Sequence, residues 1–585
     1  MIYDLVIANV RYVNLFTKEV YPAAIAVNGD RIAHVTQPGE APPRGRKEYD
    51  GGGKYAVPGL IDTHVHIESS MLEPRGFAEA VLPHGTTTVL ADPHEIGNVM
   101  GLDGIAYMLE QTAGLPLRVL LLAPSCVPSV PGLETGGACF DAFTIARMLD
   151  NDRVIGLGEV MDYQGVVNGE ARMRQILEVS RKSGKFIQGH APGLRGEALS
   201  RYLASGCESD HETHDPGEAL EKLRAGMALE CRYASNCRDL EALAPVIIAQ
   251  GYPETVTFCT DDTEPSDLLE RGHMDEVIRA AVRQGMEPVE AVKIATVNAA
   301  RLARLHDRGG LRPGNLADFL LVPDLARFEV EEVFSGGRLV ARRGALIPGA
   351  MPPRRPSGAR GTVRLGREIS LDDFRFPSRE EAVVLNTICY DREDCFVTQV
   401  QPRRFAVRDG FAELRAREGY AAFAVLERHG VNGNRSFAPV WGLGLARGAV
   451  ATTVSHDAHN LFVAGVDPGD MRLAARAVSA CGGGVACAEG GRIVCLLELP
   501  VAGLMSDRGL AEVAEKTALL RRTLEEFGMP GPSPYMMLTS FALAVIPRVR
   551  LTDCGLADTV RQKLLALECA PAKREEKGGD GICRK

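Results

Sequence analysis

Two histidines in the stretch Val57-Pro-Gly-Leu-Ile-Asp-Thr-His64-Val-His66 have the spacing of a metal-binding pair. The apolar run at residues 55–61 predicts a buried strand that ends just before them. Because alternate side chains of a strand share a face, His64 and His66 can bind one ion together. A pair of ordinary core histidines is the alternative that this spacing alone leaves open.

Further candidate ligands follow the ends of other predicted strands. Strand 154–158 precedes Glu159, strand 185–188 precedes His190, strand 206–209 precedes His211, and strand 256–259 precedes Asp261. With the first two histidines they provide four imidazoles and two carboxylates. That set can bind two divalent cations that share a carboxylate and activate a water molecule. His214 is the alternative to His211, but it falls in the loop before a predicted helix, and loops hold ligands less rigidly.

Each of these residues also has a reading without a metal. Glu159 could be a surface loop residue, His190 a core histidine, and Asp261 the N-cap of a helix. Their shared position after successive strands favours the metal site over these separate explanations.

Strand-like runs alternate with helical runs between residues 57 and 307. In addition to the strands above, the pattern predicts strands at 86–91, 118–122 and 227–231. Eight parallel strands in about 250 residues are typical of a (β/α)₈ TIM-type barrel, whose carboxyl strand ends gather at one mouth. An open, doubly wound sheet is the alternative, but it does not require polar residues at so many strand ends.

The regions outside this barrel predict two further units. Short strands in residues 1–56 and 308–350 are too few on either side to bury a core, so we expect a composite β-sandwich into which the barrel 57–307 is inserted. A segment rich in proline and arginine, 352–356, predicts a linker to a C-terminal α/β domain at 365–585. Its charged, glycine-rich end, 571–585, predicts disorder.

Composition narrows the class of partner. The chain has 66 Lys and Arg against 76 Asp and Glu, a net charge of −10, and no long basic run. Nucleic acid and anionic membranes are therefore not expected as partners. The sequence shows neither a signal-type N-terminus nor an apolar run of about 18 residues. Its 14 cysteines include no Cys-x-x-Cys pair, which predicts free thiols and a cytoplasmic protein.

Taken together, the candidate ligands resemble the amidohydrolase superfamily. That superfamily carries His-x-His after strand 1, a carboxylate or carboxylated lysine after strand 4, histidines after strands 5 and 6, and aspartate after strand 8. A glutamate after strand 4, in Gly158-Glu-Val-Met161, is similar to the branch whose members deaminate adenine. Three further stretches also resemble that branch: Asp92-Pro-His94-Glu95, Thr260-Asp-Asp-Thr263, and Val454-Ser-His456-Asp457-Ala-His459-Asn460.

The resemblance implies hydrolytic deamination of adenine to hypoxanthine and ammonia. It implies two divalent transition-metal ions, Mn²⁺ or Fe²⁺ with Zn²⁺ as a third candidate, because imidazole ligands favour these ions over Mg²⁺. The ligands it assigns are His64, His66, Glu159, His190, His211 and Asp261. We expect Asp261 to act also as the base, and Glu68, Glu212 or His94 to supply the proton for the purine ring. A homo-oligomer, as a dimer, is expected as well.

Residues outside the ligand set are expected to contact the substrate. These are His94, Asp262, His456 and His459. The stretch from His456 to Asn460 ends a predicted strand, so it is either an ordinary turn or a loop that closes over the barrel mouth; we expect the latter. Two other functions stay open. One is another amidohydrolase reaction, on a cyclic amide or an N-acetyl sugar, and the other is a non-catalytic binding protein on the same fold.

Overall fold

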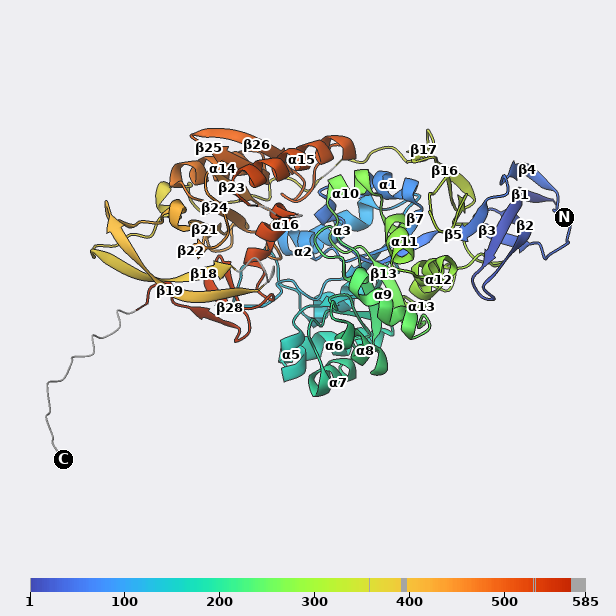
Figure 1. The fold of residues 1–585 in the computed structure, drawn as a ribbon, viewed down its shortest axis with the longest axis horizontal. Coiled ribbons are helices and arrows are strands. Elements are labelled where there is room, and N and C mark those ends of the chain that lie inside the picture. The colour runs from blue at the N-terminus through green and yellow to red at the C-terminus, as the bar shows by residue number, and fades with distance from the viewer. Residues whose placement is uncertain (1, 357, 391–396, 530, 532, 570–585) are drawn as a thin grey trace, which may run out of the picture.

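The structure, a computed structural model, describes residues 2–356, 358–390, 397–529, 531 and 533–569. The predicted disordered tail, 571–585, therefore lies outside the described residues. Figure 1 shows three parts along the long axis of the molecule: an N-terminal sheet at one end, the C-terminal domain at the other, and a helix-rich part between them. Among the described residues, no helix has both the length and the apolar character needed to cross a membrane.

The central part contains two parallel sheets. The first has the order β10-β9-β8-β7-β6 and the second the order β11-β12-β13. Their strands are β6 (Leu60–Val65), β7 (Thr86–Ala91), β8 (Arg118–Ala123), β9 (Val154–Val160), β10 (Phe186–Gly189), β11 (Ser209–Asp210), β12 (Ala228–Arg232) and β13 (Val256–Cys259). A parallel bridge between Val65 and Asp261 joins the end of β6 to the chain that follows β13. The carboxyl ends of strands from both sheets therefore lie together.

Helices connect these strands and cover the two parallel sheets. They are α1 (Pro74–Val81), α2 (His94–Met100), α3 (Leu102–Gln111), α4 (Ala142–Leu149), α5 (Tyr163–Asn168), α6 (Ala171–Ser183), α7 (Gly196–Ala204), α8 (Pro216–Arg224), α9 (Asp239–Ala249), α10 (Pro265–Glu270), α11 (Met274–Arg283), α12 (Pro288–Lys293) and α13 (Ala299–Leu302). α8 shows why such a helix begins where it does. The Asp215 side chain accepts a hydrogen bond from the Glu218 N–H, and Pro216 occupies the first turn, where no backbone donor is needed.

The prediction of one strand at residues 55–61 is wrong. The run divides into β5 (Tyr55–Pro58), which belongs to the N-terminal sheet, and β6, which belongs to the central part. Gly59 separates them, and a Cβ atom on this residue would lie 2.1 Å from Oγ1 of Thr87. The chain can pass this close to β7 only because residue 59 has no side chain.

Strands from both flanks of the central part lie in one nine-stranded sheet, rather than in two separate ones. Its order is β17-β16-β15-β14-β5-β1-β2-β3, with β4 paired to β1. The strands are β1 (Tyr3–Asn14), β2 (Glu19–Asn28), β3 (Arg31–Val35), β4 (Gly45–Asp50), β14 (Phe319–Val322), β15 (Glu332–Ser335), β16 (Arg338–Arg342) and β17 (Ala345–Leu346). β5 pairs with β1 on one side and with β14 on the other, so the two flanks meet at this strand.

The C-terminal domain is built on a second nine-stranded sheet, of order β20-β19-β18-β22-β21-β24-β23-β25-β26. Its strands are β18 (Ala382–Tyr390), β19 (Thr398–Arg408), β20 (Phe411–Ala412), β21 (Tyr420–Leu426), β22 (Arg435–Trp441), β23 (Ala449–Thr452), β24 (Leu461–Gly465), β25 (Gly484–Glu489) and β26 (Arg492–Glu498). Its pairs are antiparallel except for β18 with β22. The helices α14 (Pro468–Ala480), α15 (Leu510–Glu526) and α16 (Pro534–Thr539) and a small sheet of β27 (Val549–Thr552), β28 (Gly555–Asp558) and β29 (Lys563–Leu565) complete it.

The C-terminal domain packs against the central part through α15, which lies beside α10 and α1 (Figure 1). Arg521 on α15 donates a hydrogen bond to Glu264, which directly precedes α10, at 2.8 Å. Asn460, in the loop between β23 and β24, donates to the backbone oxygen of Thr135 at 2.9 Å. The second contact holds the β23–β24 loop against the loop that follows β8.

Candidate metal centre

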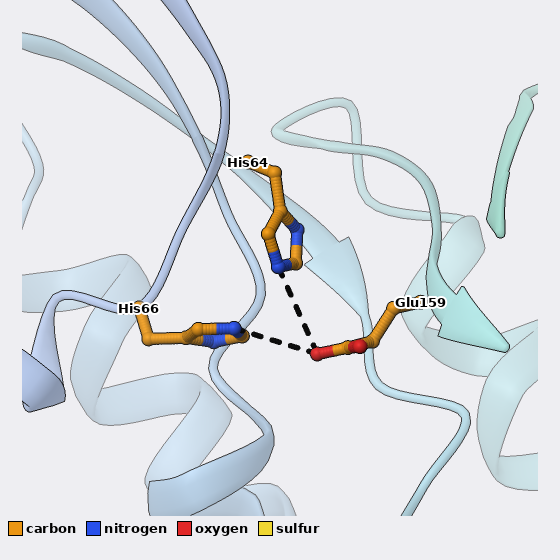
Figure 2. Close-up of side chains that lie close together, drawn as sticks. All are labelled: His64, His66 and Glu159. Carbon is orange, nitrogen blue, oxygen red and sulfur yellow. Dashed lines mark ion pairs between the residues drawn. The ribbon is translucent and has the colours of Figure 1, made fainter. Parts of the chain in front are cut away.

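His64 at the end of β6 and His66 just beyond it face two carboxylates. Nε2 of His64 lies 3.5 Å from Oδ1 of Asp261, and Nε2 of His66 lies 3.2 Å from the same oxygen. The same two nitrogens lie 3.8 Å and 3.4 Å from Oε1 of Glu159 (Figure 2). Two imidazoles and two carboxylate oxygens therefore surround one position.

Glu159, in β9, faces a second pair of histidines with its other oxygen. Oε2 lies 2.7 Å from Nδ1 of His190 and 3.4 Å from Nε2 of His211. Each carboxylate oxygen thus meets its own pair of imidazoles, which is the arrangement of a carboxylate that bridges two cations. His214, the alternative to His211, is solvent-exposed and belongs to neither group of potential ligands.

Hydrogen bonds set the orientation of the first two imidazoles. Nδ1 of His64 lies 2.8 Å from Oε1 of Gln188, and Nδ1 of His66 lies 3.0 Å from the backbone oxygen of Asp92. Both of these oxygens can only accept, so each Nδ1 carries the proton and each Nε2 keeps a free lone pair. Nε2 of His64 is buried and has no hydrogen-bond partner. A cation would satisfy this nitrogen, so the residues present fit a transition-metal centre.

The backbone before Glu159 explains the glycine in Gly158-Glu159. Oδ2 of Asp92 accepts a hydrogen bond from the Glu159 N–H at 2.9 Å. A Cβ atom on residue 158 would lie 2.1 Å from that oxygen. Glycine at this position therefore lets a carboxylate from the end of β7 hold the backbone of the bridging residue.

Asp261 faces the histidines with one oxygen and Arg232 with the other. Oδ2 accepts a hydrogen bond from Nη1 of Arg232 at 3.0 Å, and the backbone N–H of Asp261 donates to the His64 oxygen at 2.9 Å. Burial tends to raise the pKa of this carboxyl, but the adjacent imidazoles of His64 and His66 and the charge of Arg232 hold it well below its usual range. Asp261 is therefore an anion, as a metal ligand must be. Arg232 was not predicted, although it ends β12 as the candidate ligands end their strands.

The imidazoles around Glu159 lower the pKa of its carboxyl. Burial opposes the charge on Glu159, yet its contacts with His190, His211 and His66 hold its pKa well below its usual range. Burial also opposes the charge on His211, but its hydrogen bond to Glu159 raises the pKa of this imidazole to about 10. Metal binding must displace such protons, because a coordinating imidazole nitrogen carries none.

Two of the candidate proton donors lie on different sides of the centre. Glu212 accepts a hydrogen bond from Arg232 and lies 3.9 Å from Nε2 of His211. Glu68 is buried, and its Oε1 accepts a hydrogen bond from the Ile96 N–H at 3.3 Å. Oε2 of Glu68 is buried without a hydrogen-bond partner, whereas Glu212 is partly exposed and forms an ion pair with Arg232 through Oε1.

The residues expected to contact substrate form a buried cluster beside the metal centre. Nδ1 of His94 lies 3.6 Å from Oε1 of Glu159, and Nδ1 of His456 lies 3.9 Å from Oε1 of Glu95. The rings of His456 and His459 are 5.4 Å apart between centroids. The β23–β24 loop of the C-terminal domain thus reaches residues at the carboxyl end of β7.

Asp262, the fourth of these residues, connects to the same cluster through a hydroxyl. Ser69 Oγ donates to Oδ1 of Asp262 at 2.5 Å and lies 3.0 Å from Oε1 of Glu95. Ser69 and Glu95 were not predicted as site residues, because neither is a strong chemical signal by itself. Asp457 was also missed as a separate candidate, although its Oδ1 lies 3.5 Å from Nε2 of His94.

Two protein families match this chain, one over the central part and one over the C-terminal domain. Residues 55–340 match the amidohydrolase family, and residues 396–563 match the adenine deaminase C-terminal domain. Among solved structures, the β-aspartyl dipeptidase of Fervidobacterium islandicum AW-1 covers 59% of this chain and 98% of its own, at 18% identity and a TM-score of 0.44. The family match and the clustered ligands define the class: an amidohydrolase-type hydrolase with a divalent metal centre.

Relatives that match nearly the whole length of this chain belong to one family within that class. The adenine deaminase of Desulfatibacillum aliphaticivorans is 40% identical over 558 residues, covering 95% of both chains. That of Nitratidesulfovibrio vulgaris strain DP4 is 42% identical over 564 residues, again covering 95% of both. The chain belongs to the adenine deaminase family.

Proposed function

We propose that this protein catalyses the hydrolytic deamination of adenine to hypoxanthine and ammonia. One structural observation carries the proposal: the two oxygens of Glu159 face separate pairs of imidazoles, as a carboxylate that bridges two cations would. Relatives named adenine deaminase, about 40% identical over 95% of the chain, supply the substrate.

The proposed ligands for two divalent transition-metal ions are His64, His66, Glu159, His190, His211 and Asp261. Mn²⁺ or Fe²⁺ is the proposed metal, with Zn²⁺ as the third candidate, because a set of four imidazoles favours these ions over Mg²⁺. When bound, such ions lower the pKa of water to near 7 and so provide a nucleophile at neutral pH. The hydrogen bonds that His64 donates to Gln188 and that His66 donates to the Asp92 backbone oxygen keep these imidazoles in the tautomer that can coordinate.

Asp261 is the proposed general base. Arg232 holds its Oδ2, so Oδ1 is the atom that accepts a proton as water adds to C6 of adenine. Glu68 is the proposed donor to the ring nitrogen, because its Oε2 has no other partner whereas Glu212 is bound to Arg232. Asp261 then returns its proton to the amino nitrogen, which leaves as ammonia. Water thereby supplies the oxygen of hypoxanthine. As the C6 carbonyl forms, the proton of the C6 hydroxyl passes to Glu68, so both carboxyls return to their starting state.

The proposed substrate wall consists of His94, Asp262, His456 and His459. Its support is their burial or partial burial in one cluster that extends from Glu159 into the C-terminal domain. Imidazole and carboxylate groups supply the donors and acceptors that a purine edge requires. In this proposal the C-terminal domain, 365–585, completes the site, the barrel 57–307 carries the metals, and the composite unit of 1–56 and 308–350, with its nine-stranded sheet, supports the barrel.

We further propose a cytoplasmic homodimer. The cysteines that the structure describes are free thiols, as expected in a reducing compartment. β26 lies at an edge of the C-terminal sheet and exposes Ile493 and Val494, by 37% and 42%. An exposed apolar edge strand favours association with a second chain. Light scattering that gives the mass of one chain would contradict the dimer.

A substrate panel tests the proposed reaction directly. Metal-loaded protein is incubated with adenine, cytosine, dihydroorotate or N-acetylglucosamine-6-phosphate, and release of ammonia is measured together with the loss of each substrate. We expect ammonia and hypoxanthine from adenine and no turnover of the other three. Turnover of dihydroorotate or of the acetylated sugar without adenine would assign a different amidohydrolase reaction.

A further inference from the structure

Beside the metal centre, three segments distant in sequence bring together a histidine, a cysteine and an aspartate. His94 begins α2, Cys126 lies in the loop after β8, and Asp457 lies between β23 and β24 of the C-terminal domain. One ligand atom of each lies within 4.8 Å of the others, and the residues are exposed by only 2%, 1% and 1%. None of the six residues proposed to bind the two metal ions belongs to this group.

The polar atoms of His94 and Asp457 make no hydrogen bonds, and the ring nitrogens of His94 meet carboxylate oxygens only at 3.5 to 3.8 Å. Neither ring nitrogen of His94 and neither carboxylate oxygen of Asp457 makes a hydrogen bond, although all four atoms are buried. A buried carboxylate without hydrogen bonds is costly, by several kcal/mol or more, unless a cation or a donor meets it. The group therefore points to something that satisfies both the imidazole and the carboxylate.

A neighbouring group of three, Glu95, His456 and His459, fits a cation less well. Nδ1 of His459 accepts a hydrogen bond from the Ser455 N–H at 3.2 Å. The neutral ring therefore carries its proton on Nε2, and it has no lone pair left for a metal. His94 has no such constraint, because both of its ring nitrogens are uncommitted.

We propose that His94, Cys126 and Asp457 bind a third divalent cation, of the Zn²⁺ class, in addition to the two ions at Glu159. Thiolate and imidazole are the ligands that Zn²⁺ prefers, and a carboxylate completes a set of three that leaves one position for water. The charges of the thiolate and the carboxylate balance that of the ion. The site goes beyond the proposed deamination: with the ion bound, His94 of the proposed substrate wall serves as a ligand instead of a purine contact, and neither Cys126 nor Asp457 has a role in the proposed reaction.

The two ring nitrogens of His94 contact different parts of the molecule. Nε2 lies 3.5 Å from Oδ1 of Asp457, so coordination uses this nitrogen. Nδ1 lies 3.8 Å from Oδ1 of Asp92 and 3.6 Å from Oε1 of Glu159. A metal-bound imidazole commonly donates its other N–H to a carboxylate, and both are available here. The ion would thus fasten the β23–β24 loop of the C-terminal domain to the barrel loops beside the metal centre.

Cobalt substitution tests the third site with a readout that the other two cannot produce. The full-length protein, stripped with a chelator and loaded with Co²⁺, is expected to bind three ions per chain and to show a thiolate-to-cobalt charge-transfer band in the near ultraviolet. The two-metal centre has no sulfur ligand, so the band reports Cys126 alone. Cys126→Ser should abolish the band and lower the content to two ions, and Asp457→Asn should weaken binding of the third ion.

Cys207→Ser is the matched control, because Cys207 is also buried and lies outside the group. This variant should keep the band and three ions. Two ions and no band in the unmodified protein would overturn the third site, as would a band that survives Cys126→Ser. Ammonia release from adenine, measured on the same samples, reports the proposed function separately: activity without the band rejects only the third site, and the band without activity rejects only the deaminase assignment.

Discussion

Gln188 offers a way to perturb the metal centre without removing a ligand. Its Oε1 accepts the Nδ1 proton of His64 at 2.8 Å, and its Nε2 donates to the backbone oxygen of Thr63 at 2.9 Å and to Glu230. Gln188→Leu keeps a side chain of similar size but removes all of these hydrogen bonds. His64 then loses the acceptor that keeps its Nε2 free for a cation.

Two separate effects are expected from this substitution. Loss of an outer hydrogen bond to a ligating histidine typically weakens metal binding about 10- to 100-fold, or roughly 1.4–2.7 kcal/mol. The Thr63 oxygen and Glu230 are also left without a buried donor, which costs about 1–3 kcal/mol of folding free energy. The variant should therefore fold, bind metal more weakly, and recover turnover when metal is saturating.

The assay is a competition between protein and a chelator of known affinity, followed by turnover measurements at low and saturating metal. Glu230→Gln is the matched control, because it changes the opposite side of the same network and leaves the His64–Gln188 hydrogen bond in place. Unchanged metal affinity in Gln188→Leu would refute the reasoning. So would an equal loss in Glu230→Gln, since that would place the effect in packing rather than in the orientation of His64.

Three further predictions concern the base, the loop and pH. Asp261→Asn should lower kcat by about 10³ or more with a smaller change in KM, and near-normal turnover would exclude it as base. The double change His456→Ala and His459→Ala should raise KM or lower kcat with two ions still bound at the centre; an effect on stability alone would remove the loop from the site. Burial and a neighbouring guanidinium lower the pKa of His429 to about 4, so the stability that its neutral ring provides is complete above pH 6.5 and is lost as pH falls toward 4. Denaturant unfolding of His429→Gln should show about 1–2 kcal/mol less loss than the unmodified protein between pH 6.5 and 5, whereas the exposed His306→Gln should match the unmodified protein.

Local sequence patterns were sufficient for several strands that carry the site. The strands predicted at 86–91 and 256–259 have the same bounds as β7 and β13, because short apolar runs flanked by turn residues define them. The prediction failed where an apolar run is divided by backbone geometry. Gly59 separates β5 from β6 because of the nearby Thr87 side chain, and nothing within residues 55–61 indicates that contact.

Contacts between distant segments explain what the sequence did not reveal. Arg232 matters because it reaches Asp261, Gln188 because it reaches His64, and Asp457 because the C-terminal domain places it beside His94. Each of these side chains is common in turns and strand ends, so its type and position alone predict no role. In the C-terminal domain, pairing with β21, β23 and β26 identifies the short strands β24 and β25.

Titration of the metal-free protein tests the central claim most directly. Protein stripped of metal receives increasing amounts of Mn²⁺, and ammonia release from adenine is measured with the metal content of each sample. For the unmodified protein, we expect activity to rise until two ions per chain occupy the centre at Glu159. For Glu159→Gln, we expect weakened binding of both ions together with loss of activity. Full activity with one ion per chain, or a Glu159→Gln variant that keeps both ions and normal turnover, would contradict the bridging carboxylate.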